Sequence, residues 1–237
     1  MKRTHDKFYI KEANSAPVKE AFKMIADNIS DLNIKNEALL KFGDLGCAAG
    51  SLPNYINSRY PNLDVSGYEY SDDLLVTAKK TYPNIKFKKA DVTDSNSIES
   101  NSLDIITMSG VLCIFDNAQE IILNLLNWIK PNGRILIFNM FNSYDLDVFI
   151  KYKHSYETMD DGLESGWNII SQKSVSNFLE EKNVKNYKFI KFTMPFDIPK
   201  NNSDNVRSWT EKDKNMDRSI VNGLNIIQPF YLLQIDV

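Results

Sequence analysis

The feature of this sequence that most constrains its fold is a loop of small residues between an apolar run and a helical pattern. The apolar run covers residues 39–45 and carries a carboxylate, Asp44, just before its end. Apolar residues recur at helical spacing over 52–56. The loop between the two contains Gly46, Ala48 and Gly50. This pattern predicts a strand, a tight turn and a helix, the unit that places a cofactor over the carboxyl end of a parallel sheet.

The spacing within the loop distinguishes between classes of cofactor. A dinucleotide-binding loop has the pattern Gly-x-Gly-x-x-Gly, but Ser51 occupies the sixth position counted from Gly46. Asp44 lies two residues before the first glycine, where a carboxylate would repel a pyrophosphate. The loop is therefore better suited to a cofactor with an amino-acid end than to one with phosphates.

The segment Asp44-Leu-Gly-Cys-Ala-Ala-Gly50 resembles the first motif of class I S-adenosylmethionine-dependent methyltransferases, acidic-x-Gly-x-Gly-x-Gly, with Ala48 in place of the middle glycine. The resemblance covers residues 42–140 and, more loosely, the last two expected strands. It implies an α/β fold: a doubly wound, seven-stranded Rossmann-like sheet with an antiparallel last strand, in three layers, αβα. It also implies S-adenosyl-L-methionine as the cofactor and S-adenosyl-L-homocysteine as the product.

The elements expected along the chain follow the order of that fold. Strands are expected at 63–69, 85–90, 103–109 and 134–140, with helices over 15–29, from 71, and over 117–129, and a turn at 130–133. A helix over 174–181 and strands over 186–196 and 224–235 are expected to complete the sheet edge with an antiparallel pair. We expect one domain over 1–237, with an N-terminal helical segment at 1–36, an acceptor-side insertion at 143–170 and a polar loop at 197–222.

The resemblance also implies a set of cofactor contacts. In the family, the acidic residue that ends the second strand binds the ribose hydroxyls, and Glu69 lies there, about 20 residues beyond Gly50. A carboxylate suits this role because it accepts two hydroxyl hydrogen bonds at once. Asp44 would lie beneath the methionine amino group, and Asp91 would accept from the adenine amino group. The expected cofactor-binding residues are Asp44, Gly46, Ala48, Gly50, Glu69, Tyr70, Asp91, Val92 and Ser109.

The catalytic residue is less apparent than the cofactor site. Many relatives carry a histidine shortly after the fourth strand, but here Val111-Leu-Cys-Ile-Phe115 follows Ser109 and Gly110. Methyl transfer from a sulfonium requires an aligned acceptor, and requires a base only when the acceptor must lose a proton. Of the two histidines, His154 lies in the insertion and is the candidate catalytic residue; a surface histidine without a role is the alternative.

Contacts with the acceptor are assigned by position alone. Asn139 and Asn142 end the fifth strand, on the side where ligands of open α/β sheets bind. Arg207 and Trp209 belong to the polar loop and could meet an anionic acceptor, although a solvated loop with a packing tryptophan is the alternative. The expected acceptor-contacting residues are Tyr9, Asn139, Asn142, Trp167, Arg207 and Trp209.

Composition narrows the range of partners. The net charge of −3 leaves no basic excess for a nucleic-acid backbone, and no apolar run reaches the length of a membrane span. Cys47 and Cys113 are expected to be buried free thiols, and the polar segment 1–6 is not followed by the apolar core of a signal peptide. We expect a cytoplasmic protein without a metal site, and a composition rich in Asn, Lys and Ile suggests a bacterial source.

The expected function is S-adenosylmethionine-dependent methyl transfer to an oxygen, or a nitrogen, of a small polar acceptor. A sugar, a nucleotide or a surface-polysaccharide precursor is the first expectation for that acceptor, and an amine is the second. Two alternatives stay open. A nicotinamide-dependent oxidoreductase would need phosphate contacts at the loop, and a non-catalytic S-adenosylmethionine-binding partner protein would lack an acceptor pocket.

Overall fold

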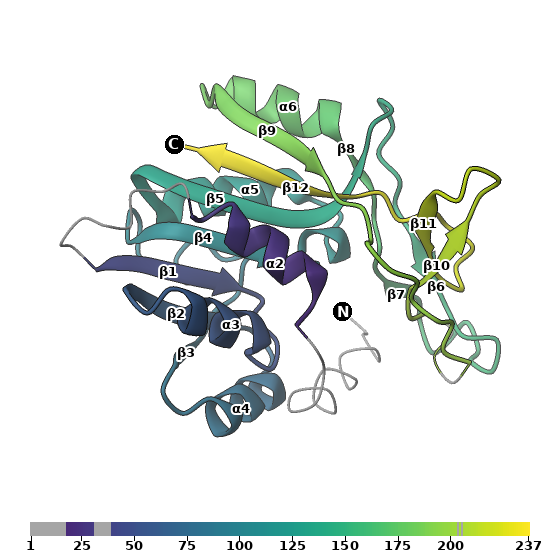
Figure 1. The fold of residues 1–237 in the computed structure, drawn as a ribbon, viewed down its shortest axis with the longest axis horizontal. Coiled ribbons are helices and arrows are strands. Elements are labelled where there is room, and N and C mark those ends of the chain that lie inside the picture. Colours follow the sequence, from purple (N-terminus) through teal and green to yellow (C-terminus); the bar gives the residue numbers. More distant parts are fainter. Residues whose placement is uncertain (1–17, 31–38, 203, 205) are drawn as a thin grey trace.

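The computed structural model describes residues 18–30, 39–202, 204 and 206–237. Within them, seven strands of the main sheet follow the order β3-β2-β1-β4-β5-β12-β9 (Figure 1). The strands are β1 (Leu40–Leu45), β2 (Leu63–Glu69), β3 (Lys86–Lys89), β4 (Leu103–Ser109), β5 (Ile129–Asn142), β9 (Asn186–Lys191) and β12 (Phe230–Asp236). β1 to β5 are parallel, and β12 is antiparallel to both of its neighbours. This confirms the expected doubly wound sheet with an antiparallel last strand.

Helices cover both faces of the sheet because the strands are apolar on both sides. One face carries α2 (Glu20–Asp27), α3 (Ser51–Arg59) and α4 (Asp72–Thr81) (Figure 1). These helices pack around the buried side chains of Phe42 and Leu136. The other carries α5 (Ala118–Trp128) and α6 (Gln172–Glu181), packed around Ile106 and Ile137. A short 3-10 helix, η1 (Leu112–Ile114), follows β4. The two apolar clusters hold the carboxyl ends of β1, β2 and β4 side by side.

Several expected boundaries were wrong. The expected turn at 130–133 lies within β5, where the register with β4 shifts between Leu103 and Ile105. The strands expected over 186–196 and 224–235 are shorter, because β9 ends at Lys191 and β12 begins at Phe230. Of the helix expected over 15–29, the described part is α2, and residues 1–17, with Tyr9, lie outside the described residues.

The two segments expected to be irregular contain short strands. The segment 197–222, expected to be a polar loop, is not a loop throughout. It includes an antiparallel pair of strands, β10 (Trp209–Lys212) and β11 (Arg218–Val221). The insertion at 143–170 contains β6 (Lys151–Tyr152) and β7 (Glu164–Ser165), also antiparallel. β8 (Ile170–Ser171) then adds a short parallel pairing at the end of β5. In Figure 1, both segments lie beyond the carboxyl ends of the parallel strands.

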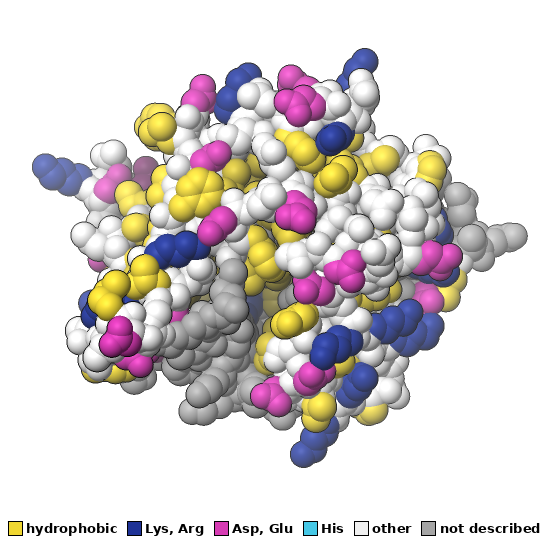
Figure 2. Space-filling view, turned by 180° about the vertical axis from the view of Figure 1, so that it is seen from behind, with side chains coloured by type: hydrophobic (Ala, Val, Ile, Leu, Met, Phe, Trp, Pro, Cys, Tyr) yellow, Lys and Arg dark blue, Asp and Glu magenta, His cyan; other side chains and the backbone are white. Residues whose placement is uncertain are grey.

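The surface of the described residues is mixed in charge. Figure 2 shows Lys and Arg side chains interspersed with Asp and Glu over one face, among scattered apolar groups. No helix in the described part of the chain is long and apolar enough to cross a membrane.

Candidate active site

The loop after β1 turns through three residues with left-handed backbone conformations. The φ angles are +74° at Gly46, +47° at Ala48 and +87° at Gly50. A Cβ at Gly46 would lie 2.4 Å from Cγ2 of Val111, and one at Gly50 would lie 2.7 Å from Cζ of Phe87. Both glycines are therefore required by packing as well as by backbone conformation. At Ala48, between the two glycines, there is room for a methyl group, but its left-handed conformation costs free energy for any L-residue.

Beneath the loop lies a buried carboxylate. Asp44 is 2% exposed, and its Oδ1 accepts a hydrogen bond of 2.8 Å from the hydroxyl of Thr107 on β4. Burial raises the pKa of Asp44 to about 7, the Thr107 bond opposes that rise, and the nearby charge of Glu69 adds to it. Burial also raises the pKa of the neighbouring Cys47 thiol. A buried acid of this kind is stabilised in its charged form by a cation placed beside it.

Glu69, at the end of β2, holds the loop in place. Its Oε2 accepts from the backbone N–H of Ala48 at 2.9 Å, and its Oε1 accepts from the N–H of Ser71 at 2.8 Å. The side chain is 9% exposed. A carboxylate oxygen can accept more than one hydrogen bond, so these contacts leave capacity for hydroxyl groups. The ribose contact stays a prediction, and the structure adds a second role for the residue.

The remaining expected cofactor residues surround the same edge of the sheet. Asp91 follows β3, and its Oδ1 accepts from the N–H and the hydroxyl of Thr93. Val92 is buried, and its carbonyl accepts from Asn124. Tyr70 is exposed beside Glu69. Ser109, half-buried, ends β4. All of the expected cofactor residues thus lie on or just after the carboxyl ends of β1, β2, β3 and β4.

This edge of the sheet fits S-adenosylmethionine. Asp44 is a buried acid that suits a cationic group, and the left-handed turn lets a ligand approach the backbone closely. Gly110, which follows Ser109, has a φ of +69°, and among the described residues a Cβ there would meet no heavy atom within 4 Å. Among the described residues, no group of three His, Cys, Asp or Glu side chains could hold a metal ion.

His154 lies in an aromatic cluster of the insertion. Its ring stacks on that of Tyr156 with centroids 5.0 Å apart, and it meets the ring of Tyr152 edge to face with centroids 5.9 Å apart. Tyr152 also contacts the ring of Trp167 at 5.7 Å. Trp167 packs in turn against the apolar group of Cys113, Met140 and Ile169. Trp167 thus connects the insertion to the sheet edge, and a catalytic role for His154 stays a prediction.

The other residues assigned to the acceptor are used differently. Asn139 is fully buried, its Oδ1 accepts from the N–H of Cys113, and its Nδ2 donates to the Met140 carbonyl. These bonds give the residue a structural role, and its contact with an acceptor stays a prediction. Asn142 bonds with its own turn, through the Tyr144 N–H and the Leu146 carbonyl.

Two acceptor candidates belong to the segment around β10. The Trp209 indole donates to Glu211, and Lys200 lies 4.6 Å above its ring. Arg207 is exposed, just before β10. Their proposed contact with an acceptor stays a prediction.

Sequence reasoning missed two residues of the site. Thr107 could have been found, because it is a polar residue in the middle of an apolar strand. Asn168, fully buried beside the segment after β4, had no such signal, because its partners lie far away in the sequence.

Residues 44–135 match a family model described as "Methyltransferase domain". A malonyl-[acyl-carrier protein] O-methyltransferase of Halalkalibacterium halodurans is 25% identical over 119 residues, which are 48% of this chain and 42% of that protein. A trans-aconitate 2-methyltransferase of Rhizobium rhizogenes is 30% identical over 94 residues, 40% of this chain and 36% of that protein. The chain therefore spans less than half the length of these two curated relatives.

Solved structures share the fold over most of the chain. The YcgJ protein of Bacillus subtilis superposes with a TM-score of 0.58 over 91% of this chain and 97% of its own, at 12% identity. An O-methyltransferase family protein of Burkholderia thailandensis gives a TM-score of 0.59 over 98% of this chain and 58% of its own, at 14% identity. At such identities the likeness concerns the fold alone.

Proposed function

Residues 44–135 match a methyltransferase domain, and the chain has the fold of the class I S-adenosylmethionine-dependent methyltransferases. From this premise we propose that it is such a methyltransferase and that it methylates an oxygen of a small carboxylic acid. The observation that carries the methyltransferase part is the buried Asp44 beneath a left-handed loop of small residues. A nicotinamide-dependent oxidoreductase, the first alternative, is disfavoured by the family match.

The acceptor part of the proposal follows from acid–base chemistry. The segment Val111–Phe115 carries no histidine or acidic side chain, and its one thiol, Cys113, is buried and directed to the Gly110 carbonyl. A hydroxyl acceptor must lose a proton to react, but a carboxylate is already ionised at neutral pH. The two relatives described above are named for malonyl and aconitate groups, and both of these carry carboxylates. None of the relatives supports the sugar, nucleotide or polysaccharide acceptor expected from the sequence.

In this proposal the protein mainly binds the cofactor and the acceptor and orients them for the transfer. S-adenosylmethionine would supply a methyl group already activated by its sulfonium. Asp44 would hold the ammonium group, Glu69 the ribose hydroxyls and Asp91 the adenine. Trp167 would form one wall of the acceptor pocket and would exclude water from it.

The test is methyl transfer from methyl-labelled S-adenosylmethionine to trans-aconitate and malonate, with glucose and a nucleoside monophosphate as hydroxyl acceptors. We expect label only in the carboxylic acids, as an ester that alkali cleaves, and we expect His154→Ala to retain that transfer. Label in a hydroxyl group, lost in His154→Ala, would overturn the carboxylate acceptor and support the histidine as base. No label in any acceptor, together with failure to bind S-adenosylhomocysteine, would overturn the function itself.

A further inference from the structure

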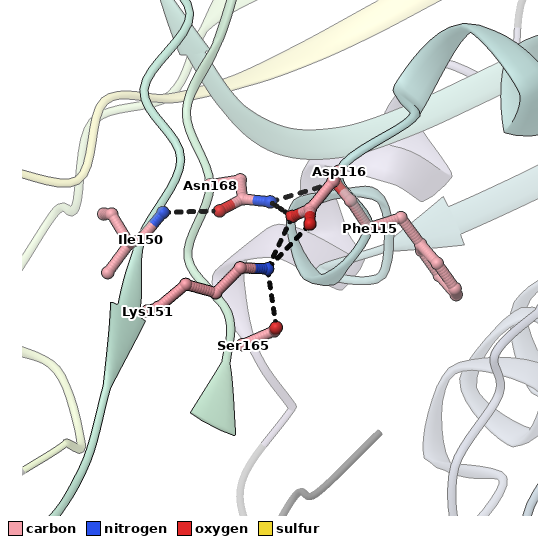
Figure 3. Close-up of polar contacts among 6 residues, drawn as sticks. All are labelled: Phe115, Asp116, Ile150, Lys151, Ser165 and Asn168. Atoms are coloured by element: carbon pink, nitrogen blue, oxygen red, sulfur yellow. Dashed lines mark hydrogen bonds and ion pairs between the residues drawn. The ribbon is translucent and has the colours of Figure 1, made fainter. Parts of the chain in front are cut away.

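Asn168 is a buried amide whose donors and acceptor are used across three segments of the chain. Its Oδ1 accepts from the N–H of Ile150 at 2.8 Å. Its Nδ2 donates to the Phe115 carbonyl at 3.0 Å and to Oδ1 of Asp116 at 2.9 Å (Figure 3). The side chain is 0% exposed. One amide therefore joins the insertion to the end of the segment after β4.

The backbone around Asn168 makes a second connection to that segment. The N–H of Asn168 donates to the Cys113 carbonyl at 2.8 Å, and the N–H of Cys113 donates to Oδ1 of Asn139 at 3.0 Å. Cys113 is thus held from both sides by buried asparagines. Two residues earlier, Val111 packs on the Cα of Gly46 in the cofactor loop, where a Cβ would meet its side chain.

An ion pair also joins the insertion to the segment after β4. The ammonium group of Lys151 lies 2.7 Å from Oδ1 of Asp116 and also donates to the hydroxyl of Ser165 at 2.7 Å (Figure 3). The Lys151 bond, followed by the Asn168 bond, holds the pKa of Asp116 below its usual value. Asp116 is therefore ionised at neutral pH, and both partners donate to it.

The residue next to Asn168 is held in a costly conformation. Trp167 has a φ of +59°, which is uncommon for a bulky side chain and persists only when the surrounding structure imposes it. The hydrogen bonds of Asn168 anchor the chain on one side of it. Its ring lies between Tyr152 and the apolar group of Cys113, Met140 and Ile169. The position of Trp167, the residue proposed to line the acceptor pocket, thus depends on the bonds that Asn168 makes to Phe115 and Asp116.

We propose that Asn168 is a positioning residue of the methyl-transfer site, which fixes the insertion to the segment after β4 so that cofactor binding orders the acceptor side. The contacts run from the cofactor loop through Val111 and Cys113 to Asn168 and then to Trp167. The inference rests on the proposed function, because it assumes that the cofactor occupies the loop at Gly46.

The test uses Asn168→Asp, which keeps the size and the Ile150 bond but loses both bonds donated by Nδ2. The probe is S-adenosylhomocysteine, and the readout is amide hydrogen exchange with and without it. In the wild type we expect the probe to slow exchange at 110–116 and at 150–168. In Asn168→Asp we expect an affinity within about threefold of the wild type, because the loop contacts remain. Exchange at 150–168 should be about tenfold faster and should no longer respond to the probe.

Three further variants separate positioning from general loss of stability. In Asn168→Asp the introduced carboxylate would face that of Asp116 and repel it. Adding Asp116→Asn removes this repulsion and restores one hydrogen bond with donor and acceptor exchanged, so the response at 150–168 should return in part. Lys151→Met should weaken that response while leaving Asn168 intact. Lys130→Met removes an equally short ion pair, to Asp104, at the amino edge of the sheet, and should leave the response unchanged.

Two outcomes would overturn the proposal while the function stands: an insertion that responds to the probe in Asn168→Asp as it does in the wild type, or one that does not respond in the wild type although the probe binds. If the probe does not bind the wild type at all, the proposed function and this inference fall together. Should Asn168→Asp fail to fold, the comparison of Lys151→Met with Lys130→Met decides, and equal responses in the two would count against the proposal.

Discussion

Asp44 and Thr107 are register partners on the adjacent parallel strands β1 and β4, and their side chains form a hydrogen bond of 2.8 Å in the interior. Neither side chain is more than 2% exposed. The pair places an acid with a pKa of about 7 directly beneath the loop that the proposal assigns to the cofactor. Protonation of Asp44 and cofactor binding should therefore be linked.

Cofactor affinity should rise with pH. The ammonium group of S-adenosylhomocysteine favours ionised Asp44, so binding below pH 7 must release the proton that the acid carries in the free protein. The dissociation constant should fall by up to about tenfold per pH unit below the pKa and should level off above about pH 8. Calorimetry at several pH values in two buffers would measure both the affinity and the released proton. Asp44→Asn should bind more weakly and without this pH dependence, and a wild type with constant affinity would contradict the linkage.

The same acid should make the fold less stable as pH rises. Burial raises the pKa of Asp44 from its ordinary value of 3.8 to about 7, so the free energy of unfolding is highest when the residue is protonated in both states. Between about pH 4 and pH 7 the wild type should lose on the order of a few kcal/mol relative to Asp44→Asn, which cannot ionise. Urea unfolding of both proteins across this range would show the difference. If the free energies of unfolding of the two proteins changed with pH in parallel, the raised pKa of Asp44 would be contradicted.

Replacing Ala48 by glycine should stabilise the protein. Ala48 has a φ of +47°, where an L-residue loses about 1–2 kcal/mol that glycine does not. Glycine costs about 0.5–1 kcal/mol in backbone entropy, so the net gain should be up to about 1.5 kcal/mol. Thermal unfolding would measure it. Ala49→Gly is the matched control, because Ala49 is buried and lacks a positive φ, and it should destabilise.

Glu69→Gln should weaken cofactor binding and loosen the loop. One carboxylate oxygen becomes an NH₂ group that faces a backbone N–H, either of Ala48 or of Ser71. We expect a loss of about 1–3 kcal/mol in binding of S-adenosylhomocysteine, together with lower stability. An analogue of S-adenosylhomocysteine without the 2′-hydroxyl separates the loss of the ribose contact from the loosening of the loop. The wild type should bind this analogue more weakly than S-adenosylhomocysteine, whereas Glu69→Gln should bind the two with equal affinity. An equal penalty in both proteins would remove the ribose assignment.

What the sequence predicted correctly is encoded locally. The small residues of the loop at 46–50 and the apolar runs that became β1, β2, β4 and β5 carry their own conformational preferences. The pair of β10 and β11 was not predicted, because its polar residues show no alternation and Val221 pairs with Trp209 across a turn. The roles of Asn139 and Asn168 were equally hidden, since each is defined by partners distant in the sequence, such as Cys113.

A crystal structure of the chain grown with S-adenosylhomocysteine would test the cofactor site most directly. We predict the amino group of the ligand above Asp44 and Gly46, its ribose hydroxyls on Glu69 and its adenine beside Asp91. A ligand bound elsewhere, or a loop at Gly46–Gly50 left without ligand at saturating concentration, would contradict the cofactor site and with it the proposed methyl transfer.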